Sequence, residues 1–300
     1  MASRLAVLTV AYHSEPSLER LAADLTRQSR PADLWLLVNN APRRAPLRAT
    51  ALPAAAAARL QILEGEEDDG FATGCNRGFD ALARSGWRDW VWLLNPDTRL
   101  PEGDELLTLR TALEALPPDA LIGTAVRADP GNLEPSAGWI DPGLAFRRRR
   151  VTPALLAATA PVSVDWLSGC SLCLRPSAHD PPARFDPAFP LYYEDMDLCC
   201  RLRRRGVPIL WLPAPVVRHR RGQGSATPSP RRLHLSTVGY LRFLRRHCRP
   251  WVLLCRSLRL LLRSLELRPP QPRRSLAVLA PVPEALGHAP TPADSSPLWL

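Results

Sequence analysis

The sequence predicts an α/β protein with a mainly parallel central sheet, helices on both faces, and further helices at the C-terminal end. Short apolar runs alternate with segments of helical spacing, and the runs are apolar throughout rather than at every second position. Polar residues follow several of these runs directly. A chain of 300 residues with 46% hydrophobic residues is long enough to bury such a core.

The first half of the chain repeats a strand-then-helix pattern. The apolar runs cover 5–11, 34–38, 60–65, 90–94 and 120–126. Leucines recur at helical spacing behind Ser14 and Pro16, a later helix ends at Gly86, and another carries Leu106 to Leu116. Between 127 and 160 the pattern fades into an insert with glycine and proline.

The second half predicts two more strands and three helices. Strand-like runs lie at 164–175 and 207–219, and a helix is expected from Leu198 to Arg205. Two further helices are expected at 231–247 and 251–267. We therefore divide the chain into a catalytic domain (1–225), a basic amphipathic helical region (226–268) and a Pro-rich, disordered tail (269–300).

The cysteines and the N-terminus indicate a reducing compartment. Seven cysteines, an odd number, occur in a chain without a basic start, apolar stretch and cleavage site of a secretion signal. Cys170 and Cys173 have metal-ligand spacing but are expected to pack as small hydrophobes. No apolar window is long enough for a spanning helix, so we expect a cytoplasmic protein.

The positive charge is concentrated in one part of the chain. The net charge is +10, and all the basic residues are arginine. Residues 201–274 contain 19 arginines and one acid, a net charge of +18, so the remainder carries −8. The acidic and basic parts are expected to have different roles.

Three short segments follow predicted parallel strands. They are Asn39-Asn40, Gly70-Phe71 and Asn95-Pro96-Asp97. The carboxyl ends of parallel strands share one edge of a sheet, where ligands bind. Asn-Pro-Asp-Thr is also a favourable β-turn sequence. Asp97 therefore has two interpretations, a turn residue or a carboxylate that binds a divalent cation beside phosphates.

Three other segments contain groups able to take part in catalysis or binding. The glycine-rich loop 66–82 contains Asn76 and Arg77, which could contact a nucleotide, although acids before a helix start also suit its dipole. The acids Glu194, Asp195 and Asp197 precede a predicted helix, and one of them could act as a general base. A histidine that follows a strand, His219, could complete a metal site.

Taken in order, these segments resemble the family-2 glycosyltransferases of the GT-A fold, most closely the rhamnosyltransferase type. The resemblance covers about residues 4–225. It rests on eight segments in the same order: "LAVLTVAYHS", "LTRQSRP", "LWLLVNNAP", "GFATGCNRGFDAL", "VWLLNPDT", "DWLSGCSLCLR", "FDPAFPLYYEDMDLCCRLRRRG" and "RHRRGQGS".

The resemblance implies roles for particular residues. Asp195 would be the catalytic base, and Asp97 with His219 would bind Mg²⁺ or Mn²⁺. Nucleotide-sugar contacts would come from Asn39, Asn40, Gly70, Asn76, Arg77, Asn95 and Asp97. Acceptor contacts would come from Trp166, Ser168, Gly169 and Glu194. Two positions depart from the family: Asn39 replaces an acid that contacts the nucleotide base, and Asn95 replaces the first acid of Asp-x-Asp.

The implied reaction is an inverting glycosyl transfer in bacterial cell-wall polysaccharide synthesis. The best candidate donor is dTDP-β-L-rhamnose, and the acceptor would be a hydroxyl of a saccharide or a lipid-linked saccharide. The enzyme would then work in the cytoplasm, at the inner face of the membrane.

The arginine-rich C-terminal region leaves alternatives open. Residues 231–267 could lie on an anionic membrane or pack on the catalytic domain with arginines toward solvent. Nucleic-acid binding is a rival that the charge permits, although no nucleic-acid-binding motif occurs. A non-catalytic scaffold with the same fold is a third possibility.

Overall fold

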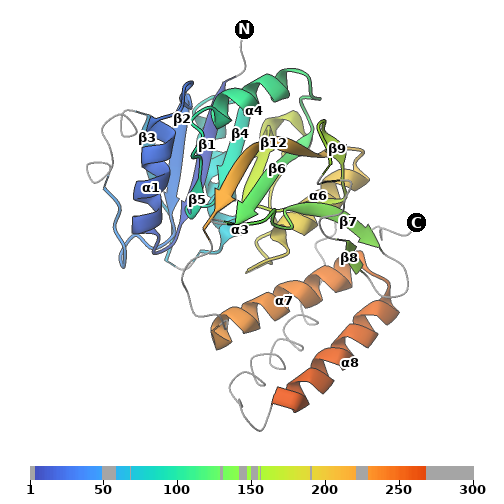
Figure 1. Cartoon of the computed structure of the whole chain (residues 1–300). Coiled ribbons are helices and arrows are strands. Elements are labelled where there is room, and N and C mark those ends of the chain that lie inside the picture. Colours follow the sequence, from blue (N-terminus) through green and yellow to red (C-terminus); the bar gives the residue numbers. More distant parts are fainter. Residues whose placement is uncertain are drawn as a thin grey trace.

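Strands and helices alternate through the first half of the chain, as the sequence predicts (Figure 1). The computed structural model describes residues 4–48, 59–67, 69–128, 131–141, 147–149, 155, 157–189, 191–220 and 229–267. The elements of the first half are β1 (Leu5–Ala11), α1 (Glu15–Thr26), β2 (Leu34–Asn39), β3 (Leu60–Glu64), α3 (Phe71–Arg84), β4 (Trp90–Leu94), β5 (Thr98–Arg99), α4 (Glu105–Glu114) and β6 (Leu121–Ala128).

The described part of the second half contains several short strands, the long strand β12 and three α-helices. They are β7 (Ala137–Asp141), β8 (Arg147–Arg149), β9 (Val162–Ser163), β10 (Trp166–Leu167), β11 (Ser171–Leu174), the short 3₁₀ helix η2 (Pro176–Ala178), α6 (Glu194–Arg204), β12 (Ile209–His219), α7 (Pro230–His247) and α8 (Pro250–Leu267). Two strands, β7 and β8, lie in the segment expected to be an irregular insert. None of the helices in the described part of the chain combines the length and apolar content needed to cross a membrane.

The main sheet has the strand order β3-β2-β1-β4-β11-β6-β12-β5, with β9 beside β12. Neighbouring strands from β3 to β4, and the pair β6 and β12, are parallel, whereas β11 runs antiparallel between β4 and β6. Six strands therefore share one direction, and their carboxyl ends share one edge. Figure 1 shows that the arrowheads of β6 and β12 point toward α7.

The core consists of two apolar layers, one on each face of the sheet. On β1, Leu5 and Val7 pack with leucines of α1 and α4, whereas Ala6 and Leu8 pack with α3 and α6. Both faces are covered, which explains why the strand sequences are apolar throughout. The mainly parallel, helix-covered sheet expected from the sequence is thus confirmed.

The strand-like run at 164–175 is divided between two sheets. β10 pairs with β7 in a small three-stranded sheet, while β11 joins the main sheet. The intervening residues 168–170 cross from one sheet to the other at the carboxyl edge. Cys170 and Cys173 are both buried, and burial raises the pKa of the Cys173 thiol.

The predicted loop position of Asn76 and Arg77 is wrong, because both lie within helix α3. The glycines of this segment suggested a loop, but Gly74 and Gly78 lie where the helix meets β1. A Cβ at Gly74 would be 2.6 Å from Val10 Cγ1, and one at Gly78 would be 2.6 Å from Leu8 Cδ1. These glycines therefore allow close helix-to-sheet packing rather than a turn.

The two expected C-terminal helices are present as α7 and α8. Helix α7 packs on the catalytic unit, with Val238, Leu241 and Phe243 buried. Helix α8 packs against α7 on the side away from the sheet (Figure 1). The domain boundary at 225 stays a prediction. The expected disordered tail and residues 221–228 lie outside the described residues.

Candidate functional site

The Asn-Pro-Asp-Thr segment forms a turn at the carboxyl end of β4. The Asn95 carbonyl accepts hydrogen bonds from the Thr98 backbone N–H at 3.1 Å and from the Thr98 hydroxyl at 2.6 Å. The Asp97 carbonyl accepts a hydrogen bond from the Arg220 N–H at 2.9 Å. The turn interpretation is therefore confirmed, and the turn presents the Asp97 side chain, which remains 30% exposed.

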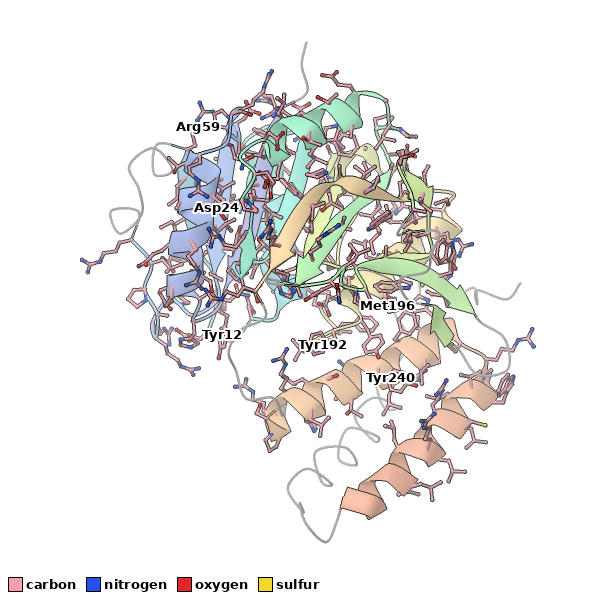
Figure 2. All side chains as sticks on the ribbon, viewed as in Figure 1. Tyr12, Asp24, Arg59, Tyr192, Met196 and Tyr240 are labelled. Atoms are coloured by element: carbon pink, nitrogen blue, oxygen red, sulfur yellow. The ribbon has the colours of Figure 1, made fainter. Side chains whose placement is uncertain are left out.

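A buried acid fixes the chain just after this turn. Asp24 of α1 accepts hydrogen bonds from the Leu100 backbone N–H at 2.9 Å and from the Arg99 guanidinium at 3.0 Å. Figure 2 shows Asp24 between α1 and the sheet. Because β5 also pairs with the end of β12, Thr98 lies opposite His219. These contacts hold Asp97 and His219 together.

Asp97, His219 and Glu134 form a cluster of interacting side chains. His219 Nε2 lies 3.2 Å from Asp97 Oδ2, and His219 Nδ1 lies 3.1 Å from Glu134 Oε2. Burial alone would lower the pKa of His219, but hydrogen bonds and charge from Asp97 and Glu134 outweigh it, so the pKa is raised. A carboxylate on the second ring nitrogen is a common way to orient a metal-binding histidine.

Sequence reasoning did not identify Glu134. It lies in the insert after β6, and its backbone N–H donates to the Val126 carbonyl at 2.7 Å. No local pattern marks an acid in such a segment. A search for acids that could partner His219 would have included it among many others.

The catalytic acid predicted from the sequence lies at the start of α6, which begins at Glu194, four residues before the expected start at Leu198. Asp195 Oδ2 accepts a hydrogen bond from the Gly169 N–H at 2.9 Å, and Oδ1 accepts one from the Met196 N–H at 2.7 Å. Hydrogen bonds from backbone N–H groups favour the charged carboxylate and fix its direction. Asp195 is partly buried.

The Asp97 turn and Asp195 meet through the crossing segment 168–170. The Asn95 N–H donates to the Cys170 carbonyl at 3.1 Å, and the adjacent Gly169 N–H binds Asp195. A Cβ at Gly169 would be 3.1 Å from Phe71 Cε1, so glycine allows this close approach. Two motifs about 100 positions apart thus become parts of one site.

Two other predicted acceptor residues lie at the start of this segment: Ser168 is its first residue, and Trp166 lies in β10 just before it. Ser168 accepts a hydrogen bond from the Cys170 N–H at 3.3 Å, and its own N–H donates to Ser136. Trp166 is buried in β10 and packs in the core. Their roles, and that of Gly169, as acceptor contacts stay predictions.

Glu194 is a buried carboxyl, 7% exposed, beside Asp195. Among the described residues, its Oε2 atom has no hydrogen-bond partner. Burial and the negative charge of Asp195 and Asp197 raise its pKa to about 8. Glu194 is therefore mainly protonated at neutral pH, and its proposed acceptor contact stays a prediction.

This pKa predicts an unusual dependence of stability on pH. The folded protein keeps the Glu194 proton up to about pH 8, whereas the unfolded chain loses it near the ordinary value of 4.5, so stability falls as pH rises between these values. Glu194→Gln has no proton to lose. We therefore expect the melting temperature of Glu194→Gln, relative to wild type, to increase as the pH is raised from 5 to 8. The corresponding change in the free energy of unfolding is on the order of 1–3 kcal/mol.

Thermal unfolding of both proteins across this pH range tests the prediction. The exposed variant Glu114→Gln is the control and should follow the wild-type curve. A difference between Glu194→Gln and wild type that does not change with pH would contradict the raised pKa.

Helix α7 braces the segment that precedes Asp195. Tyr192 and Tyr193 both adopt left-handed backbone conformations, with φ of 63° and 70°. Gly239 of α7 lies against this backbone, since a Cβ there would be 2.7 Å from the Tyr192 carbonyl oxygen. The Tyr193 ring packs on Tyr240 at 5.5 Å between centroids. Figure 2 shows Tyr192 and Tyr240 between α7 and the rest of the domain.

A buried charge network joins α6 and α7 behind this segment. Asp197 accepts hydrogen bonds from Arg201 at 2.7 Å, Arg246 at 3.0 Å and His247 at 2.8 Å. Burial would raise the pKa of Asp197, but hydrogen bonding to His247 and the arginine charges outweigh it, so the pKa is lowered. His247 has a lowered pKa through burial, and its Nδ1 accepts from Arg204, which fits a neutral ring.

Three of the residues predicted to bind the nucleotide lie at the end of β2 and in α3. Their side chains form hydrogen bonds to the backbone of neighbouring loops. Asn39 donates to the Ala45 carbonyl at 2.9 Å, and Asn40 donates to the Asp69 carbonyl at 2.7 Å, just before Gly70. Asn76 exchanges two hydrogen bonds with the Phe185 backbone, at 2.8 and 3.0 Å. Their nucleotide contacts stay predictions.

Arg77 pairs with Asp69 at the entrance to α3, at 3.0 Å. The guanidinium is about one third exposed, so one side of it remains open to solvent. Gly70 is the N-cap of α3 and has no side chain to shield the first turn of the helix. This end of the helix is a suitable place for an anion.

The side chains of Asp97 and His219 are close enough together to bind one divalent cation. A carboxylate oxygen and an imidazole nitrogen are both ligands of Mn²⁺, and they are already 3.2 Å apart. Within the described residues, no three His, Cys, Asp or Glu side chains are arranged to enclose a metal ion. A cation here would therefore need further ligands from a bound diphosphate or water.

The sequence profile of the family described as "glycosyltransferase like family 2" matches residues 3–237. Two proteins from Mycobacterium tuberculosis strains, CDC 1551 and H37Rv, are each 28% identical over 284 residues, covering 84% of this chain and 87% of theirs. Both are named "N-acetylglucosaminyl-diphospho-decaprenol L-rhamnosyltransferase".

Two solved structures share the fold. One is GalNAc-T7 with UDP, GalNAc and Mn²⁺, with a TM-score of 0.58 and 12% identity, covering 82% of this chain and 48% of that one. The other is the mannosyltransferase PcManGT from Pyrobaculum calidifontis with GDP-Man and Mn²⁺, with a TM-score of 0.54 and 15% identity, covering 98% and 78%. This chain thus spans about half the length of the first structure.

Proposed function

Because this chain belongs to glycosyltransferase family 2 and has the GT-A fold, we propose that it transfers L-rhamnose from dTDP-β-L-rhamnose to a hydroxyl of a lipid-linked saccharide, with inversion. The observation that carries the proposal is the junction at 168–170, which joins the Asp97–His219 pair to Asp195. The names of the two mycobacterial relatives support rhamnose as the donor sugar and a diphospho-lipid as the acceptor.

Asp195 is the base in this proposal. The acceptor hydroxyl attacks the anomeric carbon from the face opposite the diphosphate, the bond to the diphosphate breaks, and the hydroxyl proton passes to Asp195. The Gly169 and Met196 N–H groups hold the carboxylate in place next to the crossing segment. A single displacement inverts the anomeric centre, and the product is an α-L-rhamnoside.

Asp97 and His219 would hold Mg²⁺ or Mn²⁺ at the donor diphosphate. Such a cation stabilises the negative charge that develops on the leaving group. Glu134 keeps the His219 ring in position with Nε2 toward Asp97. Metal-containing structures of the same fold support this assignment.

The nucleotide would lie along the rim between the end of β2 and the start of α3. Asn39 and Asn40 are expected to act through the loops that they hold, since both side chains are buried. Arg77 and the N-terminus of α3 at Gly70 supply positive charge there.

We expect Asp97→Asn to abolish metal-dependent donor binding. Asparagine keeps the shape of the side chain but removes the charge that the cation requires. In wild type, Mn²⁺ should strengthen dTDP-rhamnose binding at least about tenfold, which isothermal titration can measure; in the variant it should have no effect. The exposed variant Asp104→Asn serves as the control. Equal metal dependence in wild type and Asp97→Asn would remove Asp97 from the metal site.

A further inference from the structure

Helix α8 carries an exposed row of leucines. Leu254, Leu258, Leu261 and Leu262 are 70%, 55%, 43% and 54% exposed, respectively. They recur at spacings of three and four residues, which places them on one side of the helix. We name these four residues the α8 leucine face. Val252, by contrast, is buried.

The concentration of exposed apolar side chains here is unusual for the molecule. In the described part of the chain, only three other large hydrophobic residues are comparably exposed: Tyr12, Leu107 and Tyr192. Those three belong to different segments, and single exposed hydrophobics are normal in soluble proteins. A contiguous row on one helix instead marks an interaction surface.

The charge around the α8 leucine face suits an anionic partner. Residues 230–267 contain nine arginines and one glutamate, a net charge of +8. Within α8, Arg256 and Arg259 occupy helical positions away from the leucine row, and Arg259 is exposed. An apolar row on one side of a helix, with arginines at its other positions, is the pattern of a helix that lies in the headgroup interface rather than one that crosses the membrane.

The position of α8 relative to the site also favours a membrane. Figure 1 shows α7 and α8 beyond the carboxyl edge of the main sheet, with α7 between the sheet and α8. Asp97, His219 and Asp195 lie at this same edge. A surface bound by α8 would therefore lie at the end of the molecule where the acceptor is used.

We propose that the α8 leucine face docks into the headgroup interface of an anionic bilayer, with nearby arginines contacting lipid phosphates. Helix α7 then lies between the membrane and the carboxyl edge of the main sheet, where Asp97, His219 and Asp195 lie. This inference deepens the proposed function, because it locates where a lipid-linked acceptor would be met. Docking itself requires neither donor nor transfer.

Vesicle co-sedimentation of the full chain, without donor or acceptor, tests the proposal. Vesicles of phosphatidylcholine alone are compared with vesicles containing phosphatidylglycerol, at low and high salt. We expect the protein to bind the anionic vesicles and to keep part of this binding at high salt. Salt screens the attraction between arginines and lipid phosphates but not the hydrophobic contribution of the leucines. Absence of wild-type binding would overturn the proposal.

A matched pair of variants separates the α8 leucine face from general charge. The double variant Leu254→Gln/Leu258→Gln should reduce anionic-vesicle binding at least tenfold, whereas Leu107→Gln on α4 should bind like wild type. Both change exposed leucines, and circular dichroism checks that both fold. Equal loss in both variants, or loss in neither, would contradict docking through α8.

Two further readouts identify rival occupants. Light scattering that shows a wild-type dimer which the double variant disrupts would assign the face to a second copy and overturn the proposal. Binding to duplex DNA that is tighter than to vesicles and weakens steeply with salt would do the same in favour of nucleic acid. A wild type that docks but transfers no sugar would refute the proposed function while leaving docking intact.

Discussion

Replacing Asp195 with asparagine is expected to lower kcat by about 10²–10⁴-fold, the usual contribution of a general base. Asparagine has nearly the same shape, and its single carbonyl oxygen can still accept the Gly169 N–H hydrogen bond. Its NH₂ group replaces the oxygen that accepts from the Met196 N–H, so we expect a lower melting temperature but a retained fold. It cannot take up a proton from the acceptor. Donor affinity should stay within about twofold of wild type, because Asp195 acts on the acceptor side.

The measurement is steady-state transfer together with donor titration, for wild type, Asp195→Asn and the exposed control Asp104→Asn. A selective loss of kcat identifies a residue that acts in the chemical step. Loss of the melting transition in Asp195→Asn would instead indicate a structural role. Unchanged kcat in a folded variant would remove Asp195 from the role of base.

Replacing Asp197 with alanine should destabilise the protein by about 3–5 kcal/mol, the typical cost of removing one partner from a buried ion pair. The change leaves Arg201 and Arg246 without their shared carboxylate and leaves the His247 N–H unpaired. All four side chains are largely buried, so water cannot compensate fully. The α6–α7 contact behind the catalytic segment should loosen with it.

The pH dependence gives this prediction a second readout. The pKa of Asp197 is lowered in the folded protein, so its stabilisation is present above the unfolded pKa of about 4 and is lost as pH falls below it. Chemical denaturation should therefore show the largest difference from wild type near neutral pH. Glu114→Ala, exposed at the end of α4, should change stability by no more than about 0.5 kcal/mol. A cost below about 1 kcal/mol for Asp197→Ala would contradict the network.

Local patterns identified the strands β1, β2, β3, β4, β6, β11 and β12, the turn at Asp97 and the acids at the start of α6. These depend on residues that are close in sequence: a buried strand, a proline-containing turn and a helix start. The same reasoning misassigned Asn76 and Arg77, because glycine is a poor helix former on average. At Gly74 and Gly78, packing against β1 outweighs that preference.

Other parts of the site depend on contacts between distant segments. Glu134 reaches His219 across 85 positions, and Gly239 meets Tyr192 only because α7 folds back onto α6. A sequence shows that such residues exist but does not show which of them become neighbours. For the same reason, the sequence did not decide whether residues 231–267 pack on the domain or contact a membrane. In the structure α7 packs on the domain, whereas α8 exposes its leucines.

Sugar transfer by the purified full-length protein tests the central claim most directly. The protein, Mn²⁺ and a diphospho-lipid acceptor bearing N-acetylglucosamine are incubated separately with dTDP-rhamnose, UDP-sugars and GDP-sugars, and products are identified by mass spectrometry. The account predicts that one deoxyhexose is added from dTDP-rhamnose, and that Asp97→Asn and Asp195→Asn each lower the rate of product formation at least about a hundredfold. Absence of any glycoside with every donor, from a folded wild type, would contradict it and favour a non-catalytic scaffold.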